Sequence, residues 1–123
     1  MNEKTEKNIT FEKSKKFSIR IVNLYKYLTE KKKEHIMSSQ ILRSGTSIGA
    51  NLSETLYAQS MSDFHSKAKI ALKEASETKY WLELLSETGF IEQSHYEDIN
   101  ADCEEIIRLL TSTCKTTDTK NNN

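Results

Sequence analysis

The chain has 123 residues, with 18 Lys and Arg against 18 Asp and Glu, three Gly and no Pro. This length is typical of one domain, and the scarcity of turn-forming residues disfavours sandwiches, barrels and small disulfide scaffolds. Its apolar stretches are far shorter than the roughly 20 residues of a membrane-spanning helix, and residues 1–4 do not begin an apolar signal region. We therefore expect a soluble, cytoplasmic, all-α protein.

The net charge of zero conceals two halves of opposite sign. Residues 1–57 carry 11 Lys and Arg against six Asp and Glu, whereas residues 58–123 carry seven against 12. Two interpretations stay open: helices of opposite sign pack beside each other and neutralise, or a basic face is offered to phosphates.

The first two predicted helices have apolar residues at helical spacing. In the first, Phe17, Ile21, Leu24 and Leu28 recur at steps of four, three and four, and Lys31-Lys32-Lys33 ends the helix, since cations favour a helix C-terminus. The second runs from about residue 36 to 59.

Gly45 and Gly49 stand one turn apart inside the second predicted helix. A glycine in a helix interior costs about 1 kcal/mol relative to Ala. We therefore expect a close approach to another helix at this point.

A polar, mostly uncharged stripe lies about 100° from the apolar face of the second predicted helix. It suits a hydrogen-bonded contact with another helix better than open solvent. Its members are Gln40, Ser44, Ser47, Asn51 and Glu54.

The third predicted helix, about 63–87, has two apolar rows. Ser62 is its expected N-cap and Gly89 its expected C-cap residue. The second row, with Ile70, Trp81 and Leu84, lies 100–160° from the first, so this helix should be covered on two sides.

The fourth predicted helix starts at a capping box formed by Ser94 and Glu97. Residues 9–115 should form the bundle, between a flexible N-terminus at 1–8 and a disordered tail at 116–123. Four helices with short loops predict an antiparallel up-down-up-down four-helix bundle. Because one such bundle leaves the second row of the third helix uncovered, we expect self-association.

Three motifs are long enough to be specific: QILRSGTSIGAN at residues 40–51 followed by Glu54, Asp63-Phe64, and ALKEASETKYWL at residues 71–82. They closely resemble the bacterial four helix bundle protein family, also called the 23S ribosomal RNA intervening-sequence protein or S23 family. The resemblance implies a barrel-like homopentamer, and most members have no established activity. A related branch, the accessory variability determinant of diversity-generating retroelements, is a basic pentamer that binds nucleic acid and a reverse transcriptase. The zero net charge of this chain differs from that branch.

Two sets of site residues follow from these observations. Phosphate contacts, if nucleic acid is bound, would come from Lys13, Lys15, Lys16, Arg20, Lys26 and Arg43. Arg43 has an alternative role, an ion pair with Glu54 or with a carboxylate of another subunit. Helix packing or a subunit interface is expected for Gln40, Ser44, Gly45, Ser47, Gly49, Asn51, Glu54, Lys73, Glu77 and Trp81.

Motifs of catalysis are missing from the sequence. Glu92-Gln93-Ser94-His95 is a single Glu-x-x-His where di-iron bundles need two, and two Cys with three scattered His make no metal pattern. We expect no enzyme, no cofactor and no metal, but an oligomeric scaffold that binds RNA, DNA or a protein. The alternative is a structural or protein-binding pentamer without affinity for nucleic acid.

Overall fold

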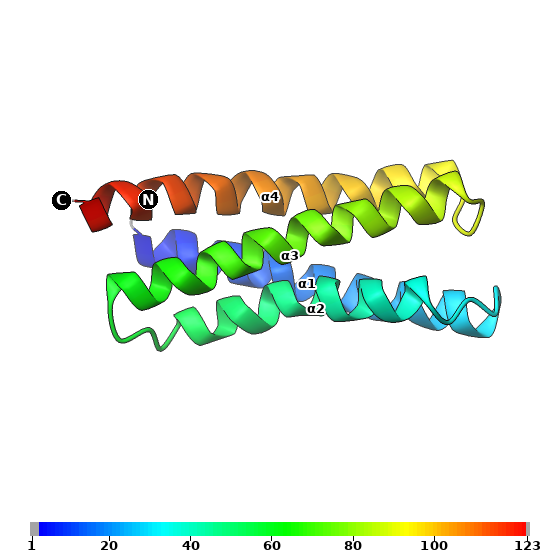
Figure 1. The fold of residues 1–123 in the computed structure, drawn as a ribbon, viewed down its shortest axis with the longest axis horizontal. Coiled ribbons are helices and arrows are strands. Elements are labelled where there is room, and N and C mark those ends of the chain that lie inside the picture. Colours follow the sequence, from blue (N-terminus) through cyan, green and yellow to red (C-terminus); the bar gives the residue numbers. More distant parts are fainter. Residues whose placement is uncertain (1–2, 123) are drawn as a thin grey trace.

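The computed structural model describes residues 3–122, and the side chains of residues 9–116. Within residues 3–122 the chain forms four α-helices and no strand: α1 (Glu3–Glu30), α2 (Met37–Thr55), α3 (Met61–Glu87) and α4 (Gln93–Asn122). This agrees with the predicted all-α bundle. Figure 1 shows the loops 31–36 and 88–92 at one end of the bundle, and the loop 56–60 with both chain ends at the other.

The core lies along the axis between the four helices. Each helix packs closely against the next one in the chain, and α1 and α4 make a smaller contact that closes the bundle. The first apolar row predicted on α3 and the apolar rows of the other helices are buried in this core, whereas the second row of α3 is not. Their fully covered members include Phe17, Ile21, Leu28, Ile41, Ile48, Leu82, Leu85, Ile99, Cys103, Ile106 and Leu110.

Gly45 and Gly49 lie against α1 of the same chain. An added Cβ at Gly45 would meet the side chain of Ile21, and one at Gly49 would meet Ser18 and Ser14. The close approach expected from these glycines therefore joins α1 and α2 within one protomer.

The sequence predicted capping residues at three helix ends, and the structure agrees with one of these predictions. The N-cap of α3 is Ser60 and not Ser62, because the Oγ of Ser60 accepts the N–H of Asp63 at 3.1 Å. Gly89 follows the C-cap of α3 with φ 83°, as its expected role requires. The predicted capping box of α4 is wrong, since Ser94 lies inside a helix that begins at Gln93.

Glu34 caps α2 in a way that the sequence did not indicate. The N-cap position, Ile36, has no side-chain cap of its own. Instead, the buried Glu34 carboxylate accepts the backbone N–H groups of Ile36, Met37 and Ser38 at 3.0–3.1 Å. A carboxylate suits this place because the N-terminus of a helix presents unpaired N–H groups and a partial positive charge.

Helical structure extends past both ends of the predicted bundle region, 9–115. It begins at Glu3 in α1 and ends at Asn122 in α4. Residues 1, 2 and 123 lie outside the described residues, as do the side chains of 1–8 and 117–123, and the flexibility expected of both ends stays a prediction. None of the helices in the described part is long and apolar enough to cross a membrane.

Candidate functional site

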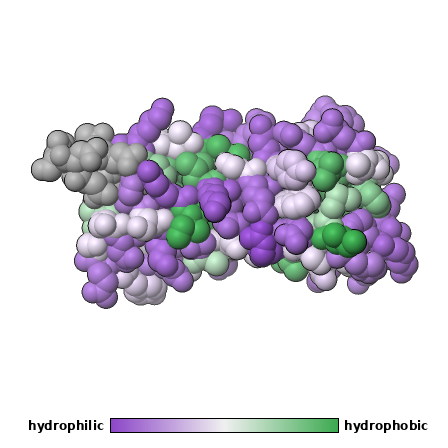
Figure 2. Space-filling model, viewed as in Figure 1, coloured by the Kyte–Doolittle hydropathy of each residue, from purple (hydrophilic) through white to green (hydrophobic). Residues whose placement is uncertain are grey.

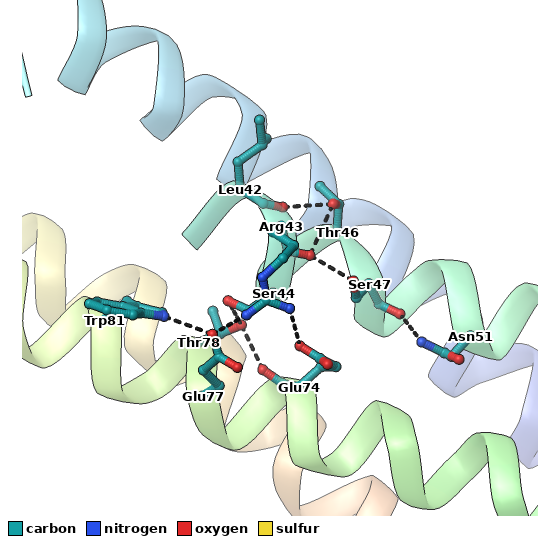
Figure 3. A network of polar contacts seen from close by, with 10 residues as sticks. All are labelled: Leu42, Arg43, Ser44, Thr46, Ser47, Asn51, Glu74, Glu77, Thr78 and Trp81. Atoms are coloured by element: carbon teal, nitrogen blue, oxygen red, sulfur yellow. Dashed lines mark hydrogen bonds and ion pairs between the residues drawn. The ribbon is translucent and has the colours of Figure 1, made fainter. Parts of the chain in front are cut away.

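Arg43 lies at the centre of a polar cluster between α2 and α3 (Figure 3). Its guanidinium donates to Glu74 Oε2 at 3.1 Å and to the carboxylate of Glu77. The indole Nε1 of Trp81 donates to the same Glu77 oxygen at 3.0 Å. Glu74, Glu77 and Trp81 come together because steps of three and four residues return to the same side of a helix.

The electrostatics keep this cluster charged at neutral pH. The hydrogen bonds from Trp81 and then from Arg43 lower the pKa of Glu77, although burial opposes the change. The hydrogen bond to Glu77, and then the one to Glu74, raises the pKa of Arg43. Arg43 is still half exposed, so the cluster forms part of the protein surface.

A buried hydrogen bond lies beneath this cluster. The hydroxyls of Thr78 and Ser44 are hydrogen-bonded at 2.9 Å, and Thr78 Oγ1 also lies 2.8 Å from the carbonyl oxygen of Glu74, which can only accept. Both Ser44 and Thr78 are fully buried. Ser44, a member of the predicted polar stripe, therefore makes a buried contact between α2 and α3.

The other uncharged members of the stripe, Gln40, Ser47 and Asn51, make no hydrogen bond to α3 among the described residues. Ser47 donates to the carbonyl of Arg43 at 2.7 Å, and Asn51 to the carbonyl of Ser47 at 2.8 Å, both within α2. Gln40 is exposed. Ser47 and Asn51 follow Arg43 along α2, beside the cluster (Figure 3).

Glu54 is not the partner of Arg43. It pairs instead with Lys67 on α3 at 2.6 Å, about three turns along α2 from Arg43. The predicted ion pair between Arg43 and Glu54 is therefore wrong. The carboxylates that Arg43 binds belong to α3 of its own chain and not to another subunit. Lys73, also expected at the interface, is exposed on α3.

Apolar side chains extend this surface along α3. Ile70 and Tyr80 are 42% and 56% exposed, and Trp81 and Leu84 are half-buried. Tyr80 and Trp81 pack edge to face with ring centroids 5.0 Å apart. Figure 2 shows, on the face where α3 crosses in front of α1, hydrophobic patches on both sides of a hydrophilic region. The second apolar row predicted on this helix is thus only partly covered by its own chain.

The predicted phosphate contacts on α1 divide into two groups. Arg20 donates to Asp102 and Asp98 of α4, each at 2.7 Å, and Lys13 pairs with Glu105 at 3.2 Å. Burial lowers the pKa of Arg20, but the hydrogen bonds to Asp102 and Asp98 outweigh it and raise the pKa. These pairs match the interpretation in which helices of opposite sign neutralise each other.

The second group is exposed. Lys15, Lys16 and Lys26 lie on the surface of α1, and none of them makes an ion pair within the described residues. Sequence reasoning missed the acidic partners on α4, although Asp98, Asp102 and Glu105 recur at steps of four and three and so share one side of a helix.

Comparisons with known proteins agree with this architecture. The family model for the 23S rRNA-intervening sequence protein matches residues 6–112. The chain is similar to a crystal structure, at 1.70 Å resolution, of a protein with unknown function from the S23 ribosomal protein family of Bacteroides thetaiotaomicron. The two are 56% identical with a TM-score of 0.87, and the match covers 89% of this chain and 98% of the other. No curated protein matches the sequence.

Proposed function

Because the chain belongs to the family of 23S rRNA-intervening sequence proteins, we propose that it is a non-enzymatic scaffold, a cytoplasmic homopentamer of antiparallel up-down-up-down bundles. The observation that carries this proposal is the apolar surface of α3. The placement of the loops at alternating ends of the bundle supports the antiparallel arrangement.

The α3 surface has the composition of a protein interface. Exposed apolar patches rimmed by polar residues mark interaction sites, and Trp, Tyr and Arg are enriched among the residues that dominate binding. Ile70, Tyr80 and Trp81 provide the apolar part, and Arg43 lies beside them. Since Arg43 already bonds to Glu74 and Glu77, a second subunit that covers it would not leave the guanidinium unpaired.

The solution mass tests the proposal directly. Light scattering after nuclease treatment should give a mass near five times the 14.2 kDa of one chain. Ile70→Lys combined with Tyr80→Lys should reduce the mass to that of a monomer, because charges enter an apolar contact. Ala101→Lys, at an exposed site on α4, is the matched control and should leave the mass unchanged. A monomeric wild type, or assembly of the double variant, would contradict the proposal.

Binding of RNA or DNA is a second candidate function, supported by the exposed Lys15, Lys16 and Lys26. Five copies of this group would form a positive belt whose weak contacts add through avidity. Filter binding to structured RNA at two salt concentrations should show affinity that falls steeply with salt, and Lys15→Gln, Lys16→Gln and Lys26→Gln together should abolish it. No binding at low salt would leave the alternative, a pentamer that binds only proteins.

A further inference from the structure

We infer that neighbouring subunits lie side by side with parallel axes, and that the basic loop 31–36 of one copy meets the acidic end of α3 and α4 of the next at the same end of the bundle. The inference rests on the proposed assembly and specifies a contact within it. The contact joins two charged surfaces that form no ion pair with each other within the described part of a single chain.

The basic surface is formed by Lys31, Lys32 and Lys33, all exposed. The next residue, Glu34, could neutralise one of them, but its carboxylate is buried and accepts three N–H groups at the start of α2. The backbone turns sharply at Lys33, where φ is 55°. The loop therefore presents three positive charges while its own acidic residue faces inward.

The acidic surface lies where α3 and α4 meet. Residues 80–107 contain no Lys or Arg, and Glu87, Glu92 and Glu97 are exposed among them. Glu97 accepts a hydrogen bond from Gln93, which carries no charge. Lys79 is the nearest basic residue in α3, and it already contacts Glu83 and Glu104 at 3.8 and 3.7 Å.

Both surfaces lie at the same end of the bundle (Figure 1). Among the described residues, no ion pair links loop 31–36 to Glu87, Glu92 or Glu97. A neighbour whose bundle axis runs in the same direction places its acidic end at the height of the basic loop. A neighbour turned end for end places its loop 56–60 there instead. The charge pattern therefore selects the parallel arrangement, in which unlike surfaces meet as in a closed ring.

A second copy fits this end better than a polyanion does. A nucleic acid that approached Lys31, Lys32 and Lys33 would also meet the acidic end beside them, which repels phosphates. An identical subunit carries both signs at the same height, so it satisfies both surfaces at once. Complementary charges of this kind fix partner and register more than they add affinity.

Charge reversal and exchange test the contact. The measured quantity is the protein concentration at which half of the chains are assembled. At low salt it should rise at least about tenfold in the triple variant Lys31→Glu, Lys32→Glu and Lys33→Glu, since like charges then face each other. Glu87→Lys, Glu92→Lys and Glu97→Lys should do the same. In the chain that carries all six changes, the concentration of half-assembly should lie within about threefold of the wild-type value, because the attraction is restored with its signs exchanged.

Controls separate folding and other contacts from this effect. Circular dichroism must show native helix content, and the neutral triple variant Lys31→Gln, Lys32→Gln and Lys33→Gln should weaken assembly less than reversal does. Reversal of Lys15, Lys16 and Lys26 to Glu, on the surface of α1, should leave half-assembly within about threefold of wild type.

The outcomes distinguish the two proposals. A wild type that is monomeric at every salt concentration refutes the scaffold and this contact with it. A wild type that assembles, with reversal variants that assemble equally well, overturns this contact alone. Reversal of the three lysines could instead remove RNA binding without affecting assembly. That result would assign the loop to phosphate binding and would also overturn the subunit contact.

Discussion

Gly45 on α2 lies so close to Ile21 on α1 that a Cβ at position 45 would stand 2.8 Å from Ile21 Cγ1 and 2.9 Å from its Cγ2. Ile21 is fully buried and β-branched, so it has few other rotamers to adopt. The contact explains why a residue that disfavours helices occupies a helix interior here.

Gly45→Ala should therefore destabilise the protein. Overpacking of a core costs about 1–3 kcal/mol, which exceeds the gain of about 1 kcal/mol in helix propensity. Gly49→Ala is the matched comparison, because its Cβ would lie 3.3 Å from the Oγ of Ser18, a small side chain that can move. Urea denaturation should show a clear loss for Gly45→Ala and little change for Gly49→Ala. Equal free energies of unfolding for the two variants would contradict this assignment.

Glu34→Ala should destabilise the start of α2. The substitution leaves three backbone N–H groups without the carboxylate that now accepts them, and loss of hydrogen bonds to a charged group costs about 1.5–3 kcal/mol. Glu30→Ala, at an exposed position in the last turn of α1, is the control and should change stability by less than about 0.5 kcal/mol. Chemical denaturation of both variants measures the difference, and similar values would show that the cap is dispensable.

Thr78→Val should cost about 1–3 kcal/mol, since the buried Ser44 hydroxyl then loses its hydrogen-bond partner on α3. Ser44→Ala combined with Thr78→Val should cost less than the sum of the single changes, because the second substitution removes a group that was already unpaired. A double-mutant cycle by urea denaturation checks this. Strict additivity would mean that the two hydroxyls do not interact.

Glu77 should make stability depend on pH in the acid range. The pKa of Glu77 is lowered in the folded chain, first by Trp81 and then by Arg43, so its contribution is present above the unfolded pKa of about 4.3 and is lost as pH falls through the folded pKa. Because the side chain is one third exposed, screening keeps the contribution to about 0.5–1 kcal/mol. Glu77→Gln should be less stable than wild type at pH 7, and the difference should shrink towards pH 3. A difference that is independent of pH would exclude this ionisation as its source.

The presence of four helices and the side of each that is buried could be predicted from the sequence alone, whereas the positions of several helix ends could not. Periodicity of three and four residues marks the side of a helix that must leave water, whatever element covers it. Phe17, Ile21, Leu82 and Ile106 are buried for that reason. Gly45 and Gly49 likewise indicated a close helix contact before the identity of the other helix was known.

The partners of the charged residues were decided only by the tertiary structure. Arg43 and Glu54 share α2, but eleven residues at about 1.5 Å each place them too far apart to pair. Arg43 binds Glu74 and Glu77 on α3 instead, and Glu54 binds Lys67. Arg20 belongs to a basic helix, but Asp98 and Asp102 of α4 neutralise it. Long charged side chains at a surface gain little from any one pairing, so the nearest suitable charge on the adjacent helix selects the partner. Helix adjacency is a property of the whole packed core, to which distant parts of the chain contribute.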